Sequence, residues 1–310
     1  MPRASAEPPN DGTAAGRLAL VFSDIKIAHS IFALPFAVMG AFLARGTDES
    51  SASFVGQLAL IVVCMVLART WAMLVNRLAD ARIDAANPRT AARAIASGRL
   101  AFSSGVWFAV AAGAMFVGVC ALFWVFFSNP WPLWLSAPTL AWIAFYSFTK
   151  RFTWLCHVFL GGALAASPLA AAIAVRPDAL ADTAALWWIA GMVLAWVAGF
   201  DVIYALQDET YDSEVGLRSV PARFGWRKAI WISRALHLLA VGCLVMAGLS
   251  EPRFGVWFWV GVGAVGGVLI AEHAVLAIRG RAGLPMAFFT CNGVVSCVLG
   301  VAGVVDLAVW

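Results

Sequence analysis

Two acidic clusters with the same spacing are the strongest chemical signal in this 310-residue chain. Both place oxygen-bearing side chains four residues apart: Asn76, Asp80 and Asp84 in the first cluster, and Tyr204, Asp208 and Asp212 in the second. On an α-helix this spacing puts a cluster on one face, where carboxylates repel each other unless a cation lies between them. Such oxygens suit Mg²⁺, which proteins hold with a few carboxylates and the phosphates of a substrate. The two clusters therefore predict a Mg²⁺ site that binds a diphosphate.

Each cluster alone also fits the solvated end of a helix at a membrane surface, because three matching residues are a weak signal. Each, however, follows an apolar segment and precedes a basic stretch, which reads NPRTAARAIASGR after the first cluster and GLRSVPARFGWRK after the second. The recurrence of the whole arrangement favours one shared binding site over two unrelated helix ends.

A short basic loop is expected on the same side of the membrane. It reads YSFTKR, from Tyr146 to Arg151. A Lys-Arg pair commonly sets membrane topology. It can also neutralise a diphosphate, since Arg151 can form two hydrogen bonds to phosphate and Lys150 adds a point charge.

Asp201 lies inside an apolar segment, about three helical turns before Asp212. A carboxylate at that depth is costly and usually functional, although a structural contact with a neighbouring helix is the alternative. Tyr204 follows one turn later and can orient a substrate oxygen. The four histidines, His29 and His157 among them, lack metal-ligand spacing.

The composition is that of a polytopic membrane protein. The chain is 62% hydrophobic and 12% charged, and apolar stretches long enough to span a bilayer recur along it. The predicted fold is all-α, with nine transmembrane helices at 27–45, 54–75, 104–127, 131–148, 154–175, 185–206, 228–248, 254–277 and 286–306. Residues 1–17 are predicted to be a disordered cytoplasmic N-terminus and residues 18–310 one transmembrane domain.

The placement of lysine and arginine predicts the orientation. The connections after spans 2, 4, 6 and 8 hold nearly all of them, whereas the opposite connections hold only Arg45, Arg176 and Arg253. By the positive-inside rule the N-terminus is cytoplasmic and the C-terminus is outside. This bias explains the positive charge balance, so the charge indicates contact with a lipid bilayer and no nucleic acid.

The recurrence of the clusters also predicts the architecture. The first cluster ends span 2 and the second ends span 6, so the repeat unit is four spans. An even number of spans gives both copies the same orientation. We therefore expect two parallel four-helix repeats plus one helix, around a central cavity into which both clusters point.

At this level of detail the sequence resembles a known family. NRLADARIDAANPRT with AIASGRL is similar to the first aspartate-rich motif of the UbiA superfamily of intramembrane aromatic prenyltransferases, and DVIYALQDETYDSEVGLRSVPARFG is similar to the second. YSFTKR and IAHSIFALPFA also fit, and the likeness covers essentially the whole chain. One departure is Arg77, which stands where the family commonly has aspartate.

The resemblance implies Mg²⁺-dependent transfer of a polyprenyl group from polyprenyl diphosphate to a small aromatic acid similar to 4-hydroxybenzoate, in quinone biosynthesis in the bacterial inner membrane. A closely similar branch acts on 1,4-dihydroxy-6-naphthoate in the futalosine route to menaquinone. The implied roles are metal binding, diphosphate binding, and positioning or deprotonation of the aromatic ring. The metal ligands would be Asn76, Asp80, Asp84, Asp208 and Asp212. The diphosphate would be bound by Lys150, Arg151, Arg89, Arg93 and Tyr146, and the ring would be positioned or deprotonated by Asp201 and Tyr204.

Three other interpretations remain open. A transporter of an anionic solute would share the repeat and the intramembrane charges, but its site would lie nearer the membrane midplane. Haem farnesylation is a rival within the family. A non-catalytic scaffold would not explain the matched carboxylate spacing.

Overall fold

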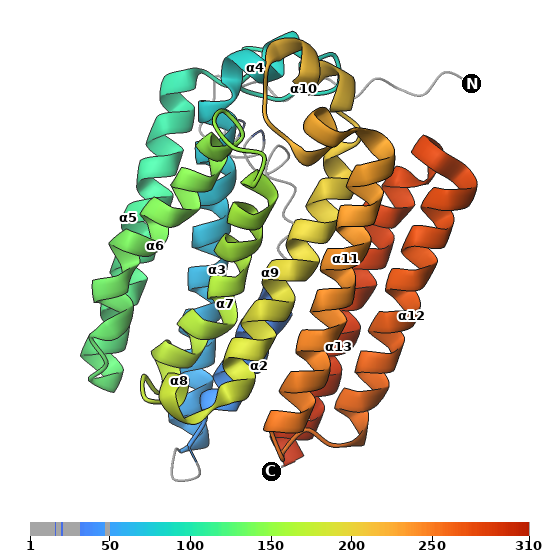
Figure 1. Ribbon diagram of the computed structural model, residues 1–310. Helices are drawn as coiled ribbons and strands as arrows, with labels where there is room; N and C mark the ends of the chain where they lie inside the picture. Colours follow the sequence, from blue (N-terminus) through green and yellow to red (C-terminus); the bar gives the residue numbers. More distant parts are fainter. Residues whose placement is uncertain (1–15, 17–19, 21–31, 47–49, 310) are drawn as a thin grey trace, which may run out of the picture.

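The computed structural model describes residues 16, 20, 32–46 and 50–309, and every regular element in these residues is a helix (Figure 1). Nearly all of the predicted disordered stretch, as well as His29, lies outside the described residues. The helices run in chain order as α2 (Leu34–Ala44), α3 (Ser51–Ala79), α4 (Ala81–Ala86), α5 (Phe102–Phe127), α6 (Trp131–Thr149), α7 (Cys156–Val175), α8 (Ala179–Asp182), α9 (Ala184–Ala205), α10 (Glu209–Val215), α11 (Val220–Ser250), α12 (Val256–Arg279), the 3₁₀-helix η2 (Gly280–Gly283), the π-helix η3 (Met286–Cys291) and α13 (Asn292–Val309).

Seven helical stretches in the described part of the chain are long and apolar enough to cross a membrane: α3, α5, α7, α9, α11, α12 with η2, and η3 with α13. The other two predicted spans are also helical. α2 has 11 described residues, and α6 has 19 residues, among which tryptophan, proline and tyrosine lower the mean hydropathy. Large apolar side chains cover the outer faces, with Ile278 84% and Leu238 74% exposed. The chain is therefore an all-helical, multi-pass membrane protein.

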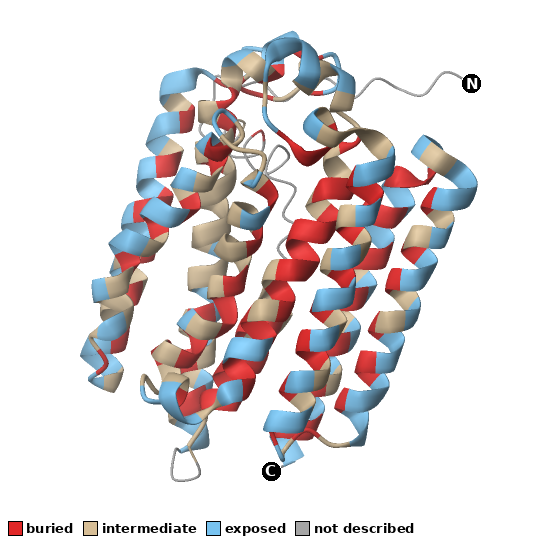
Figure 2. Ribbon diagram, in the orientation of Figure 1, coloured by how far each residue is buried: buried red, intermediate tan, exposed pale blue. Residues whose placement is uncertain are grey.

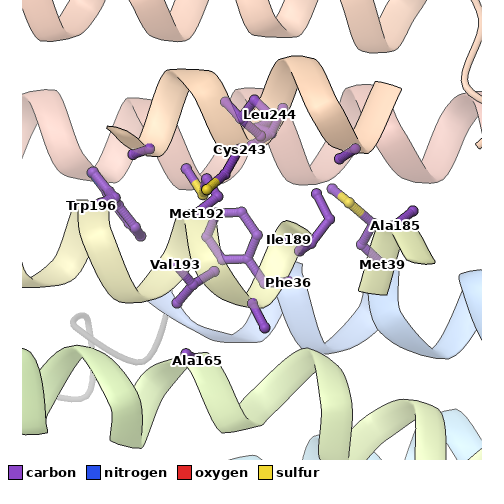
Figure 3. Packing of buried hydrophobic residues seen from close by; sticks show 14 of the residues in the cluster. Phe36, Met39, Ala165, Ala185, Ile189, Met192, Val193, Trp196, Cys243 and Leu244 are labelled. Carbon is purple, nitrogen blue, oxygen red and sulfur yellow. The ribbon is translucent and has the colours of Figure 1, made fainter. Parts of the chain in front are cut away.

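The long helix α9 occupies the centre of the bundle, between α7 and α11 (Figure 1). It is the most deeply buried of the candidate spans, and Figure 2 shows its buried residues along almost its full length. Side chains of α9 such as Ile189, Val193 and Trp196 pack with Phe36 of α2 and Leu244 of α11 (Figure 3). Because α9 leads directly into the second acidic cluster, this packing fixes the cluster against a rigid core.

Close helix contact also anchors α2, the helix that follows the undescribed N-terminal segment. A Cβ atom at Gly40 would lie 2.3 Å from the carbonyl oxygen of Pro168 in α7. Only glycine allows the two backbones to approach this closely, as small residues do at many membrane helix contacts.

The continuous helices predicted for the acidic clusters are wrong. α3 ends at Ala79, Asp80 has φ −98° and ψ 6°, and α4 begins at the next residue. Asp208 has φ −107° and ψ 8° between α9 and α10. A spacing of four is compatible with an unbroken helix, so it carries no signal for these breaks. Their matched geometry supports the predicted repeat.

The two breaks place the short helices α4 and α10 together at one end of the bundle, and the C-terminus of α13 lies at the opposite end (Figure 1). The Tyr211 hydroxyl in α10 donates a hydrogen bond of 2.8 Å to the Ile83 carbonyl in α4. This contact spans 128 residues of the sequence and joins the two clusters at one end of the molecule.

Candidate functional site

Both acidic clusters line one cavity of about 560 Å³. The cavity lies at the end of the bundle where α4 and α10 meet, and it extends down between α3, α7 and α9. The predicted residues on its wall are Asn76, Asp80, Asp84, Arg89, Arg93, Tyr146, Lys150, Asp201, Tyr204, Asp208 and Asp212. Arg151 is outside the wall but contacts Asp80. The sequence therefore identified residues that the fold brings together from three separate segments, 76–93, 146–151 and 201–212.

Asp80 lies at the break after α3 and is almost completely buried. Lys150 Nζ lies 2.5 Å from its Oδ2 atom, and Arg151 Nη2 lies 3.3 Å from its Oδ1 atom. Arg151 also donates to the Ala79 carbonyl at 2.6 Å. The basic loop after α6 therefore contacts the first cluster directly, and the buried carboxylate is compensated by two cations.

Asp84, on α4, is compensated from within its own half of the protein. Arg93 Nη1 lies 2.6 Å from Asp84 Oδ1, and Thr90 donates to the Asp84 carbonyl at 3.1 Å. The Oδ2 atom of Asp84 is buried and accepts no hydrogen bond from the described residues. A buried carboxylate oxygen without a donor is unfavourable, so this atom is available to a cation in the cavity.

Asp208, at the break after α9, joins the two halves. Arg89 binds both of its oxygens, with Nε 2.8 Å from Oδ1, and Asn87 Nδ2 donates to Oδ1 at 3.0 Å. Arg89 Nη1 also donates to the Tyr204 hydroxyl at 3.0 Å. Burial alone would lower the pKa of Arg89, but the hydrogen bonds to Asp208 raise that pKa above its usual value. Arg89 therefore stays charged in contact with the second cluster.

Asp212 has no cation within ion-pair distance among the described residues, and its Oδ2 atom accepts a hydrogen bond of 3.1 Å from Ser219. Burial raises the pKa of the Asp212 carboxyl to about 6. The hydrogen bond from Ser219 opposes this rise, and the nearby negative charge of Asp208 adds to it. A cation bound near this carboxylate would therefore stabilise its charged form.

Asp201 lies deeper, on α9, and contacts none of the cluster residues through a hydrogen bond. Its Oδ2 atom is 2.6 Å from Nδ1 of His157 in α7. The Nε2 atom of His157 accepts a hydrogen bond of 3.2 Å from the backbone N–H of Val220. Asp201, which the sequence separates from the predicted metal ligands, thus has a different set of partners.

With this geometry established, comparison with known proteins identifies the family. A model of the UbiA prenyltransferase family matches residues 33–294. The chain belongs to this family. It is 33% identical over 234 residues to a 4-hydroxybenzoate octaprenyltransferase of Pseudomonas fluorescens (strain Pf0-1), which is 75% of this chain and 74% of that protein. The chain is therefore a UbiA family prenyltransferase that resembles the 4-hydroxybenzoate octaprenyltransferases.

Solved structures of UbiA proteins share its fold. The apo structure of a UbiA homolog from Aeropyrum pernix K1 matches with a TM-score of 0.79 and 31% identity, over 90% of this chain and 98% of that one. A UbiA homolog from Archaeoglobus fulgidus bound to GPP and Mg²⁺ matches with a TM-score of 0.63 and 16% identity, over 93% and 99% of the two chains.

The cavity of this UbiA protein fits Mg²⁺. All of its predicted ligands carry side-chain oxygens and line one cavity, and Asp84 Oδ2 is buried without a donor among the described residues. In the described part of the chain no three His, Cys, Asp or Glu side chains converge on one point to hold an ion by themselves. Mg²⁺ usually completes its octahedron with water and substrate phosphates, so a partial set of carboxylates is sufficient.

Sequence analysis missed a buried cation in the cavity. Arg69, on α3, lines its wall, and the Nε atom of Arg69 is buried without a hydrogen-bond partner among the described residues. Arg69 precedes Asn76 by seven residues, so it lies on the same helix face about 10 Å deeper. The available signal was a lone charge inside an apolar span at heptad distance from the first cluster.

The inner end of the cavity is apolar, and sequence analysis did not identify its residues. They are Phe32, Leu160, Leu164, Val197, Phe200 and Phe288. Phe288 comes from the π-helix η3 and packs on Tyr204 with ring centroids 4.3 Å apart. Buried Asn292 donates to the carbonyls of Ala287 and Phe288 at 3.1 Å, and so satisfies oxygens of the π-helical turn.

Proposed function

We propose that this UbiA protein transfers a polyprenyl group from its diphosphate to a small hydroxylated aromatic acid, 4-hydroxybenzoate in the first place, with Mg²⁺ as cofactor. The observation that carries the proposal is the order of groups along one cavity. Carboxylates and cations surround its mouth, Arg69 and Asp201 follow, and an apolar wall closes the inner end. This order matches a diphosphate, a polar aromatic acid and a hydrocarbon chain.

The diphosphate would bind between the two acidic clusters. Its negative charge attracts the cations that now contact the carboxylates, namely Arg89, Arg93, Lys150 and Arg151. Arginine suits this role because its planar guanidinium binds two phosphate oxygens at once. Mg²⁺, held by oxygens of Asn76, Asp80, Asp84, Asp208 and Asp212, would supply further positive charge to the leaving diphosphate. Tyr146 also lines the cavity wall and would contact this substrate.

The reaction breaks the allylic C–O bond, and the electron pair leaves on the diphosphate oxygen. Cations fixed around the mouth stabilise that developing charge without reorganisation. The ring carbon beside the aromatic hydroxyl then forms a bond to the allylic carbon. The ring proton leaves to a base, for which Asp201 is the carboxylate on the cavity wall outside the clusters. Tyr204, whose hydroxyl accepts a hydrogen bond of 3.0 Å from Arg89, would orient the acceptor hydroxyl.

Arg69 supports an acid as acceptor. It is a cation inside a transmembrane helix, and charged residues there usually face a pathway or cavity and bind an opposite charge. Its depth places it beyond the carboxylates of the first cluster, where the acceptor's carboxylate would lie. The apolar wall formed by Phe200 and Phe288 excludes water, which would otherwise react with the allylic cation.

The proposed setting is the bacterial inner membrane, with the cavity mouth and the N-terminus on the cytoplasmic side and the C-terminus outside. The excess of lysine and arginine at the ends of the helices near the mouth supports this orientation. The basic loops also concentrate cations where anionic substrates arrive.

The test is product formation by purified protein in detergent, with farnesyl diphosphate and Mg²⁺. 4-Hydroxybenzoate and 1,4-dihydroxy-6-naphthoate are offered separately, and mass spectrometry identifies the products. We expect a farnesylated 4-hydroxybenzoate that disappears in EDTA. Product from the naphthoate alone would move the proposal to the futalosine branch. Uptake of either acid into proteoliposomes without any prenylated product would support the transporter alternative instead.

A further inference from the structure

His157, on α7, is buried against α9 and the start of α11, with 3% of its surface exposed. Both of its ring nitrogens are engaged, one by Val220 N–H and the other by Asp201. A histidine that only capped a helix would need one of these contacts. The second contact links it to the one cavity carboxylate that stands apart from the metal clusters.

The contact with Val220 fixes the form of the ring. Val220 is the first residue of α11, so its N–H has no partner within the helix and can only donate. The Nε2 atom of His157 must therefore carry a lone pair, and the ring proton is on Nδ1. A doubly protonated ring would place two N–H groups against each other at 3.2 Å, at the positive end of a helix dipole. The neutral Nδ1–H tautomer is the one that fits.

We propose that His157 is a positioning residue for the acceptor carboxylate Asp201, an inference that rests on the proposed function. As the Nδ1–H tautomer, His157 donates to Asp201 Oδ2 and holds that oxygen away from the substrate. No other hydrogen bond joins the Asp201 carboxylate to a described residue, and the side chain is 22% exposed on the cavity wall. The Oδ1 atom is therefore presented to the acceptor ring in a defined direction.

The same contact ties Asp201 to the metal side of the cavity. Val220 follows Ser219, whose hydroxyl donates to Asp212 at 3.1 Å, and Arg218 N–H donates to the Lys150 carbonyl at 2.7 Å. The turn before α11 thus holds a predicted metal ligand and, through His157, the acceptor carboxylate. This continuity sets the distance between the diphosphate end and the aromatic end of the cavity.

Two variants test the two ring nitrogens of His157 separately. His157→Asn keeps an amide N–H near the position of Nδ1, so it can still donate to Asp201. His157→Gln reaches the position of Nε2, so it can accept from Val220 but no longer supports Asp201. We expect the asparagine variant to keep kcat/KM for the acceptor within about threefold, and the glutamine variant to lose about 10- to 100-fold, the effect of one hydrogen bond to a charged group.

The affinity for a non-hydrolysable farnesyl thiodiphosphate with Mg²⁺ should be unchanged in both variants. In an Asp201→Asn background, His157→Gln should add almost no further loss, because the two residues act as one unit. Thermal unfolding is measured alongside to confirm that the variants fold. Equal losses in the two variants, an additive double mutant, or a fall in thiodiphosphate affinity would each overturn the assignment.

A second readout does not depend on activity. ¹⁵N NMR of protein labelled at its four histidines reports the tautomer, and the His157→Gln spectrum identifies the resonance. We expect the Nδ1–H form in the wild type; an Nε2–H or doubly protonated ring would refute the inference. If the wild-type protein shows this tautomer but transfers no prenyl group, the proposed function fails while the His157–Asp201 contact stands.

Discussion

Replacing Arg69 by methionine should remove the preference for an acidic acceptor that the proposed function implies. Methionine has a similar length but no charge, so the change removes the guanidinium with little loss of packing. Arg69 lines the cavity about 10 Å below Asn76 along α3, and its Nε atom is already desolvated. A carboxylate that binds there forms a partly buried ion pair.

The size of the effect follows from that burial. Breaking a buried ion pair costs about 3–5 kcal/mol, and the open cavity favours the lower end of this range. A loss of about 3 kcal/mol corresponds to about a 100-fold fall in kcat/KM. The loss should apply only to acceptors that carry the carboxylate, because no ion pair joins the guanidinium to a described residue and its Nε atom is buried without a hydrogen bond.

The assay compares 4-hydroxybenzoate with its neutral methyl ester at saturating farnesyl diphosphate and Mg²⁺. We expect the wild type to favour the acid about 100-fold, Arg69→Met to use both equally, and Arg69→Lys to keep part of the preference because it keeps the charge. Removing an uncompensated buried cation should also leave the ligand-free protein at least as resistant to heat. An Arg69→Met protein with the acid-to-ester ratio of the wild type would refute the reasoning.

Two further perturbations test other parts of the structure. Asp80→Ala and Asp208→Ala should each lower prenyl transfer at least 100-fold and weaken Mg²⁺-dependent binding of farnesyl thiodiphosphate in titration calorimetry. The control is Asp182→Ala, at an exposed carboxylate in the short helix α8, which should change neither quantity. Normal turnover in either cluster variant would exclude that residue from the metal site. Asn292→Ala should lower the free energy of unfolding by about 2–4 kcal/mol, because it leaves the buried Trp196 indole N–H without its acceptor and removes two hydrogen bonds to η3 carbonyls. Unchanged thermal unfolding would show that the indole N–H finds another partner.

The helices and the contents of the cavity mouth could be predicted because their signals are local. Apolar length marks each span, and the spacing of Asp80 and Asp208 within their clusters survives any change in helix direction. The breaks at these two residues could not be predicted, since the same spacing fits a continuous helix. They arise where the chain leaves the long helices α3 and α9 and enters the short helices α4 and α10, which are joined by the hydrogen bond from Tyr211 to the Ile83 carbonyl.

The deeper residues were harder to assign because their partners come from distant segments. His157 was visible in the sequence, but its contacts are with Asp201, 44 residues away, and with Val220, 63 residues away. Phe288 reaches the cavity through a π-helical turn, for which a run of apolar residues gives no warning. Arg69 had a signal, which is an unexplained charge in an apolar span.

The ion pairs at the cavity mouth have a consequence for the order in which ligands arrive. Arg89, Arg93 and Lys150 each form an ion pair with a carboxylate of the clusters. A diphosphate alone would draw these cations away and leave the carboxylates exposed to one another, while Mg²⁺ alone would displace the cations with no anion to receive them. Arriving together, the two ligands exchange partners with the protein so that every charge stays compensated. Substrate and metal should therefore bind with strong mutual cooperativity, each raising the affinity for the other by the same factor.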